Sequence, residues 1–305
     1  MNKALVEVAI GLLFYQGQVL VGWREAKQHQ GNKYEFPGGK VELNETAQHA
    51  CRRETREEVG IDIAHWHAFD LIKHEYEDLC VHLHIFHAEV NQQQLGQIQS
   101  PWTWQAREQL LHLSFPKANQ TIIQRLCPPQ QMKILNVNLE DDLVSVQQAL
   151  TSSIDQGWIY LRGQLSANLI AQLETCEVLW LQRLVVNIEV YQQASLALQT
   201  QIAAVHFRQQ QMTIEMRPQH KCCLAACHDQ ASLILAQELG FEVLLLSPVH
   251  MTASHPEQVG LGWQAFEQLA QSCAVPVFAL GGIKPTDLAQ AQQHAAYGVA
   301  GLSGF

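Results

Sequence analysis

Residues 38–61 read GGKVELNETAQHACRRETREEVGI, and their spacing predicts a helix with an acidic face. Glu54, Glu57 and Glu58 stand at positions i, i+3 and i+4, which lie side by side on a helix. We therefore predict a helix over residues 46–59 that presents three carboxylates together.

The three carboxylates would repel one another unless cations bind them. Oxygen-rich clusters suit Mg²⁺, which keeps bound waters and takes further ligands from substrate phosphates, and Mn²⁺ suits the same donors. Gly38 and Gly39 precede the helix and let the backbone turn sharply, so that a carbonyl can approach a metal ion. The competing interpretation is a solvated acidic face, which a bare pattern of three glutamates would favour.

The wider spacing decides between these interpretations. It runs Gly39, five residues, Glu45, seven residues, Arg53-Glu54, two residues, Glu57-Glu58, one residue, Gly60 and an apolar residue. This resembles the signature of the Nudix hydrolases, except that Thr55 stands where the family usually has an aliphatic residue. We expect Thr55 to face the core. The resemblance implies an α/β/α sandwich with a mixed sheet over residues 1–128.

Two flanking segments narrow the resemblance to the MutT type, the diphosphatases of 8-oxo-dGTP. They are KYEFPGGK at residues 33–40 and SFPKAN at residues 114–119. The resemblance implies a Mg²⁺-dependent nucleoside triphosphate pyrophosphohydrolase that directs water to the inner phosphorus and releases a nucleoside monophosphate and pyrophosphate. Its role would be nucleotide-pool sanitisation in DNA repair and replication.

The resemblance also implies roles for individual residues of the helix. Glu54 would deprotonate the attacking water or bind a metal ion that does so. The metal ligands would be Gly39 through its carbonyl, Glu54, Glu57 and Glu58. The other catalytic residues would be Arg53 and Glu45, which would brace the helix by an ion pair, and Lys40, which would lie near the phosphates.

Substrate recognition is implied at four further positions. Arg24 would reach the phosphate or the base, and Asn119 would read the purine edge, since an amide offers a donor and an acceptor. Phe36 would stack on the base, with a plain core aromatic as the alternative. The Asp-Arg pair that the MutT type carries near the base is Asp78-Leu79 here, so Asp78 would act without the arginine.

A second departure concerns a loop carboxylate. MutT-type enzymes carry a further glutamate before a tryptophan as an extra metal ligand. The corresponding stretch, residues 95–104, has no carboxylate, and Ile98 occupies the expected position. The resemblance therefore leaves slower catalysis or a different preferred nucleotide open.

The pattern changes after Pro128-Pro129, because adjacent prolines resist both helix and central strand. We predict a linker at residues 129–132 and a second domain at residues 133–305. There, eight short apolar runs alternate with amphipathic stretches and predict eight βα units, a (β/α)₈ barrel. The runs are 133–137, 158–161, 184–188, 203–207, 222–226, 242–246, 276–280 and 299–302. We expect a barrel trimmed at its last helix, closed by the first domain or a second subunit.

The second domain resembles thiamine monophosphate synthase, notably at residues 241–249 and 275–283. Its catalytic carboxylates are missing, since Ile188 replaces an aspartate and residues 208–211 carry no acidic group. A family lysine is replaced by His255. Gly281 and Gly282 would bind a phosphate through backbone amides, or would only serve the strand-to-helix turn. We predict a non-catalytic domain used for homo-oligomer assembly or small-phosphate sensing.

Composition limits the partners. The net charge is −10, which disfavours nucleic acid and anionic membranes, and no apolar run approaches the ~20 residues of a membrane span. The eight cysteines form no CxxC pair and indicate cytoplasmic thiols. The alternative for Cys222, Cys223, Cys227 and His228 is a zinc site.

Three functions remain open from the sequence. The first is hydrolysis of 8-oxo-dGTP or a related triphosphate. The second is a Nudix hydrolase for thiamine-type pyrophosphates, motivated by the second domain. The third is a binding protein whose barrel senses a phosphate ligand and gates the first domain. The acidic helix favours catalysis over pure binding, and the Asn119 segment favours a purine.

Overall fold

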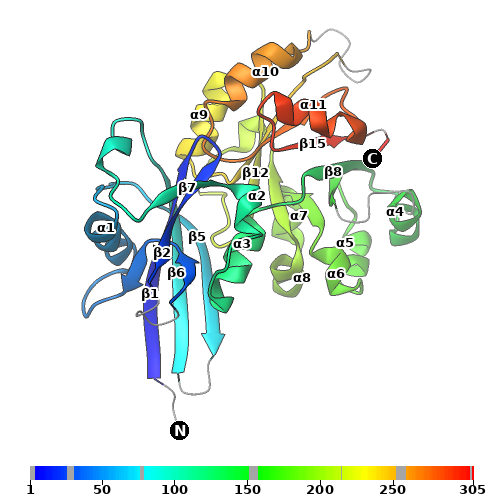
Figure 1. The fold of residues 1–305 in the computed structure, drawn as a ribbon. Helices are drawn as coiled ribbons and strands as arrows, with labels where there is room; N and C mark the ends of the chain where they lie inside the picture. The colour runs from blue at the N-terminus through cyan, green and yellow to red at the C-terminus, as the bar shows by residue number, and fades with distance from the viewer. Residues whose placement is uncertain are drawn as a thin grey trace. The chain divides into compact units, whose positions relative to one another are not determined.

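The computed structural model describes residues 4–25, 31–75, 79–150, 157–213, 215–251, 259–302 and 304–305. The chain divides into two compact units, Met1–Pro128 and Pro129–Phe305, and Figure 1 colours them along the chain. Within the described ranges, no helix is long and apolar enough to cross a membrane.

The first unit is built on a seven-stranded mixed sheet. The order is β3-β2-β1-β6-β5, with β4 paired to β1 and β7 paired to β2. β1 and β6 run parallel, whereas β2 and β5 lie antiparallel to their neighbours β1 and β6. The strands are β1 (Ala4–Tyr15), β2 (Gln18–Arg24), β3 (Lys33–Glu35), β4 (Gly38–Lys40), β5 (His67–Glu75), β6 (Leu79–Glu89) and β7 (Thr103–Ala106).

A tight turn sets the register of β1 and β2. Gln16 and Gly17 both have positive φ, 44° and 75°, and Tyr15 pairs with Gln18 across them. Two consecutive residues with positive φ form the turn whose twist matches that of paired strands.

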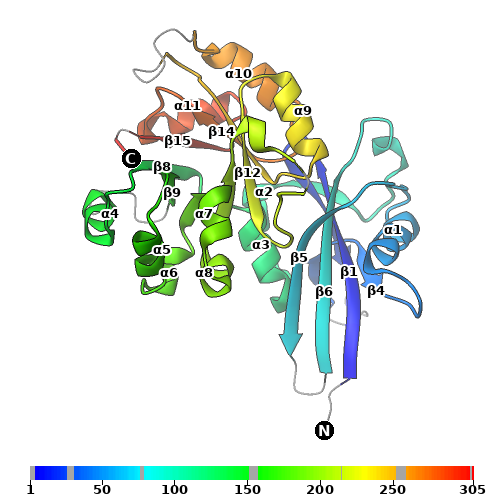
Figure 2. The same ribbon diagram turned by 180° about the vertical axis from the view of Figure 1, so that it is seen from behind.

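Helices cover both faces of this sheet. They are α1 (Ala47–Glu58), α2 (Arg107–Leu110) and α3 (Gln120–Leu126), with 3-10 turns at Leu95–Gln97 and Lys117–Asn119. Ala50 and Cys51 of α1 pack against Ala9 and Leu13 of β1. The guanidinium of Arg125 in α3 lies over the Phe69 ring of β5. Figures 1 and 2 show α1 and α3 on opposite faces, which is the predicted α/β/α sandwich.

Local signals position α1. The Thr46 side chain accepts a hydrogen bond from the backbone N of His49 at 3.2 Å and caps the helix. Gly60 follows with φ of 91°, the left-handed conformation that ends helices. Thr55 is fully buried, so the prediction that it faces the core is confirmed.

The second unit is a closed barrel of eight parallel strands. Its strands are β8 (Gln131–Val137), β9 (Trp158–Gly163), β10 (Leu184–Asn187), β11 (Ala204–Phe207), β12 (Cys222–Cys227), β13 (Val243–Leu246), β14 (Val277–Leu280) and β15 (Gly298–Gly301). All eight predicted strands are present. β15 pairs with β8, so the expectation that another domain or subunit closes the sheet is wrong. β8 begins at Gln131, inside the predicted linker 129–132.

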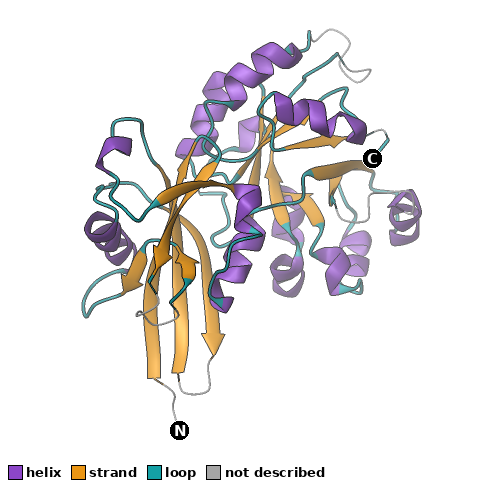
Figure 3. Cartoon of the chain, viewed as in Figure 1, coloured by secondary structure: helices purple, strands orange, loops and turns teal. Residues whose placement is uncertain are grey.

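Helices alternate with most of the barrel strands, as Figure 3 shows. They are α4 (Leu143–Leu150), α5 (Ala167–Leu173), α6 (Val178–Leu181), α7 (Ile188–Gln193), α8 (Leu196–Gln201), α9 (Gln230–Glu238), α10 (Gly262–Ala270) and α11 (Leu288–Gln293). The described part of the connection from β11 to β12 holds only the 3-10 turn Gln209–Gln211. A further 3-10 turn, Pro285–Asp287, precedes α11. Among residues 302 and 304–305, no helix follows β15.

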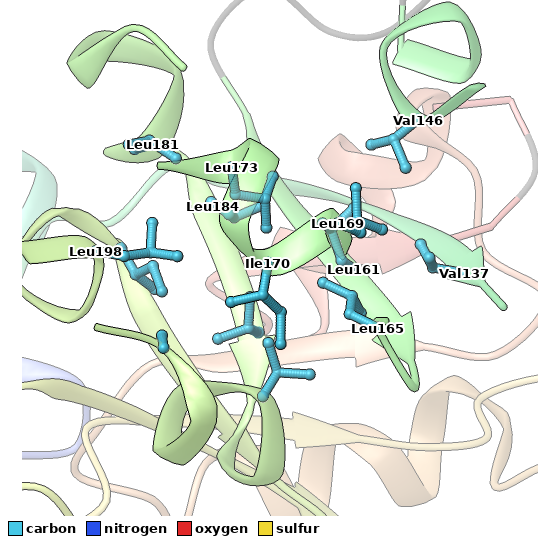
Figure 4. Packing of buried hydrophobic residues seen from close by; sticks show 14 of the residues in the cluster. Val137, Val146, Leu161, Leu165, Leu169, Ile170, Leu173, Leu181, Leu184 and Leu198 are labelled. Atoms are coloured by element: carbon cyan, nitrogen blue, oxygen red, sulfur yellow. The ribbon is translucent and has the colours of Figure 1, made fainter. Parts of the chain in front are cut away.

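Two apolar cores hold the barrel together. Met132, Trp158, Leu224 and Phe278 belong to the cluster contributed by alternate strand residues, as expected for a filled barrel interior. The other cluster lies between the strands and the helices from α4 to α8, where Leu169 and Leu173 pack against strand residues such as Leu161 (Figure 4).

Candidate active site

Arg53 is the centre of the charged network on α1. Its Nε and Nη2 donate to the two carboxylate oxygens of Glu45 at 3.1 and 3.0 Å. Its Nη1 donates to Glu54 at 2.8 Å and to Glu57 at 3.4 Å, and Nη2 also donates to the Lys40 carbonyl at 3.1 Å. The hydrogen bond from Arg53 lowers the pKa of Glu45, and the reciprocal contacts raise the pKa of Arg53. The predicted brace between Arg53 and Glu45 therefore exists as a two-point ion pair.

Glu54 lies directly against the backbone at Gly39. A Cβ atom on residue 39 would stand 2.1 Å from Oε1 of Glu54, far inside van der Waals contact. Gly39 sits in β4, which pairs with Ala9 of β1. The strand therefore delivers the backbone of residue 39 to the carboxylate of Glu54.

Glu58 lies beneath the same turn. Its Oε2 accepts a hydrogen bond from the Gly38 backbone N at 3.0 Å. The residue as a whole is exposed, but neighbouring atoms crowd its carboxyl group. This desolvation raises the pKa of Glu58 to about 7, and the negative charges of Glu54 and Glu35 raise it further. Arg24 acts in the opposite direction.

Glu35 joins the site without having been predicted. Arg24 contacts one oxygen of Glu35, Oε2, with Nε at 2.6 Å and Nη2 at 2.5 Å. Arg24 itself lies opposite Lys33 on the paired strands β2 and β3. No sequence signal identifies Glu35, because its place depends on this strand pairing.

An aromatic group lies on the other side of β3. Tyr34 and Phe36 both contact the ring of Phe115, and Phe36 stacks on it at 5.1 Å between centroids with 21° between planes. Phe36 is buried, at 5% exposure, so the core-aromatic alternative fits its packing. Asn119 is buried at 8% exposure. Within the described part of the chain its side-chain amide has no hydrogen-bond partner and does not cap the following helix. Asp78 lies outside the described residues.

The loop after η1 covers the end of α1. The backbone N of Gln99 donates to the Val59 carbonyl at 3.0 Å, and the Trp102 indole donates to the Glu58 carbonyl at 2.8 Å. Ile98 packs against the apolar cluster between α1 and the sheet. It therefore serves the core at the position where the sequence lacked a carboxylate.

The donor set suits a hard divalent cation, although it is not preassembled. Across the described residues, no three acidic, histidine or cysteine side chains are arranged to hold an ion as they stand, and this holds for Cys222, Cys223, Cys227 and His228 as well as for the glutamates of α1. Arg53 engages Glu54 and Glu57 instead. Carboxylate and carbonyl oxygens are the ligands that Mg²⁺ prefers, and the missing Cβ at Gly39 leaves that backbone accessible. The residues thus fit the ion.

The mouth of the barrel is organised differently. Gly281 and Gly282 have φ of 98° and 68°, and a Cβ on either would stand 2.7 or 2.8 Å from Pro248 or His250. The turn and its packing therefore require glycine without any ligand. Ile188 is buried, and the neighbouring Glu189 is engaged by Arg208 and Gln211. His255 lies outside the described residues.

A buried polar pair joins β9 and β11. The Tyr160 hydroxyl stands 2.9 Å from His206 Nδ1. Burial lowers the pKa of His206 to about 3, with Arg162 and Arg208 lowering it further. His206 is therefore neutral at ordinary pH.

The fold and the site together define a phosphoanhydride hydrolase unit joined to a parallel barrel. Residues 9–125 match the NUDIX domain, and residues 133–305 match thiamine monophosphate synthase. The chain belongs to the Nudix family through its first unit and to the thiamine monophosphate synthase family through its second. The first unit is accordingly a hydrolase of pyrophosphate bonds that resembles the 8-oxo-dGTP diphosphatases.

Individual relatives agree with this assignment. The 8-oxo-dGTP diphosphatase of Escherichia coli K12 is 32% identical over 123 residues, which are 40% of this chain and 95% of that protein. The CTP pyrophosphohydrolase of the same organism is 34% identical over 27% of this chain and 62% of its own length. A putative thiamine-phosphate synthase 2 of Aquifex aeolicus is 34% identical over 26% of this chain, and the match spans 43% of that protein.

Proposed function

We propose that the chain is a Mg²⁺-dependent nucleoside triphosphate pyrophosphohydrolase that acts on 8-oxo-dGTP or a closely related purine triphosphate. The products would be the nucleoside monophosphate and pyrophosphate. The observation that carries the proposal is the Arg53-braced helix with Glu54 seated on Gly39. This arrangement gathers acidic oxygens at one place and fixes one of them against an open backbone.

The roles of the chain's own residues follow from this geometry. Gly39, Glu57 and Glu58 would hold Mg²⁺, which when bound makes water more acidic and offsets charge on the phosphates. Glu54 would take the proton from the attacking water, because Arg53 holds its carboxylate in place. The charge of Lys40, which is exposed on β4, would attract the phosphate chain.

The base and the phosphates of the substrate would lie on opposite sides of β3. Residues in a strand point alternately to opposite faces, so Tyr34 and Phe36 face the aromatic side while Glu35 faces the charged side with Arg24. The unpartnered Asn119 amide would pair with a purine edge on the aromatic side. The phosphates would lie on the charged side.

A substrate panel tests the proposal. The pure protein would be incubated with Mg²⁺ and 8-oxo-dGTP, dGTP, dATP, CTP and thiamine pyrophosphate, and released pyrophosphate or phosphate would be measured. We expect pyrophosphate from 8-oxo-dGTP at a kcat/KM well above that for CTP. Absence of turnover for every nucleotide would refute the proposal. Preferential turnover of thiamine pyrophosphate would support the second candidate, which the family of the barrel unit favours.

The barrel unit is proposed to be non-catalytic. Ile188 carries no acidic group, and Glu189 is held through Oε1 by Arg208 and Gln211, while its Oε2 is buried and has no partner among the described residues. Assembly of a homo-oligomer through this unit, or sensing of a small phosphate at Gly281 and Gly282, remains its proposed role. Light scattering of the full chain measures the oligomeric state, and calorimetric titration with inorganic phosphate measures phosphate binding.

A further inference from the structure

Glu35 faces the end of α1 that carries the acidic side chains. Across the strands it pairs with Gly22 of β2. A Cβ on Gly22 would stand 2.7 Å from the Trp102 ring, and the indole of Trp102 donates to the Glu58 carbonyl at 2.8 Å. Trp102 therefore contacts both Gly22, which lies opposite Glu35, and Glu58 of α1.

The short chain segment from Glu35 to Gly38 also limits the distance between Glu35 and Glu58. Gly38 is three residues beyond Glu35 and donates its N–H to the Glu58 carboxylate at 3.0 Å. Three extended residues span at most about 10 Å. The flexible glutamate side chains can cover much of that distance, and the negative charge of Glu35 already acts on Glu58.

The carboxylate of Glu35 is only half engaged. Both nitrogen contacts of Arg24 go to Oε2. Oε1 has no partner among the described residues, while the side chain is 22% exposed. Arg24 thus fixes the direction of the carboxylate and leaves one oxygen available to a ligand.

Charge and direction both favour a cation at this oxygen. Glu54, Glu58 and Glu35 bring three acidic side chains to one region, where Arg53 contacts Glu54 and Arg24 contacts Glu35, while Glu58 has no ion pair among the described residues. Like charges this close are unfavourable unless a cation joins them. Mg²⁺ needs ligands from several directions, and Glu35 comes from a strand rather than from the helix. The loop at residues 95–102, which also approaches α1, contains no carboxylate.

We propose that Glu35 is a further carboxylate ligand of the divalent cation and that Arg24 positions it. The inference rests on the proposed metal-dependent function of the first unit. Its chemistry requires only that the free oxygen of Glu35 binds the ion together with oxygens from Gly39 and α1.

The test measures binding of Mn²⁺ alone to the full chain, from the electron paramagnetic resonance signal of the free ion. We expect Glu35→Gln to weaken Mn²⁺ binding at least tenfold, since even residues that only support metal ligands contribute about 10- to 100-fold. Glu42→Gln is the matched control, because Glu42 is an exposed glutamate of the same segment. It should bind as the wild type does. Glu35→Asp, which keeps the charge, should fall between the two.

A variant of Arg24 separates a ligand from a structural partner. If Glu35 binds the ion, Arg24→Gln loses the contact that positions Glu35 but also removes a competing positive charge, so it should weaken Mn²⁺ binding less than Glu35→Gln does. Equal weakening by Arg24→Gln and Glu35→Gln would overturn the proposal, as would wild-type affinity in Glu35→Gln or equal weakening in Glu42→Gln. Thermal melting confirms that each variant is folded, and Glu35→Asp carries the test if Glu35→Gln is not. A wild-type chain that binds no Mn²⁺ would instead contradict the proposed function itself.

Discussion

Glu54 occupies the space that a side chain at Gly39 would need, since a Cβ there would stand 2.1 Å from Oε1. Gly39→Ala should therefore displace the carboxylate and lower kcat by about 100-fold, as expected for a misplacement near 1 Å. Gly96→Ala is the matched control, because no atom lies within 4 Å of its added Cβ. Steady-state kinetics on both variants check this, and near-normal turnover by Gly39→Ala would contradict the arrangement.

Glu54→Gln should separate binding from turnover. The amide keeps an oxygen that can accept from Arg53 Nη1 but cannot take a proton from water. We expect the variant to fold and to bind the Mg²⁺-nucleotide complex, with kcat reduced about 10²- to 10⁴-fold. Calorimetric binding and single-turnover kinetics measure the two effects. Retained turnover would place the base elsewhere.

Arg53→Lys should loosen the acidic helix. Lysine cannot reproduce the two-point contact with Glu45 or reach Glu54 and the Lys40 carbonyl at once. We expect the first unit to lose about 1–3 kcal/mol of unfolding free energy, measured by urea denaturation. Arg52→Lys is the control, and its exposed pair with Asp62 should contribute less because solvent screens it. Equal losses in both variants would argue against a special role for Arg53.

Asn119→Ala tests the aromatic side of β3. Loss of the amide should raise KM for purine triphosphates about tenfold, the effect of roughly one or two hydrogen bonds, while kcat changes little. Gln120→Ala, at the exposed neighbouring position, should leave KM unchanged. A fall in kcat with an unchanged KM would show that Asn119 does not read the base.

The barrel should lose stability in acid. The pKa of His206 is about 3 in the folded chain and about 6.5 when unfolded, so between these values the unfolded state binds more protons. Stability is therefore complete above pH 6.5 and falls toward pH 3, by up to about 1.4 kcal/mol per pH unit. His206→Asn should flatten this slope in urea denaturation from pH 4 to 7. An unchanged slope would assign it to other groups.

The sequence predicted features that are encoded locally. The acidic face of α1 follows from the spacing of Glu54, Glu57 and Glu58, and the eight barrel strands follow from short apolar runs. β3 and β4 leave no clear strand pattern in the sequence, because each has three residues and the segment between them contains Pro37. Their strand geometry comes from pairing with β2 and β1. No local sequence pattern predicts this pairing.

In the candidate site, too, contacts encoded by a local spacing were predicted and contacts that depend on strand pairing were not. Arg53 and Glu45 lie eight residues apart in the signature spacing, whereas Arg24 and Glu35 meet only because β2 and β3 pair. The barrel also carries no helix in the described part of the connection from β11 to β12. Gln-rich sequence there is polar enough for either a helix or a loop, so composition could not decide.

The pairing of β15 with β8 affects which substitutions the second unit can tolerate. A ring of strands exposes no unpaired backbone edge, and such edges are what seed aggregation when a sheet is left open. Side chains at the rim can therefore be exchanged during evolution with little danger to solubility. For the non-catalytic role proposed for the second unit, this closed ring would let the fold persist without its original chemistry and take on another use.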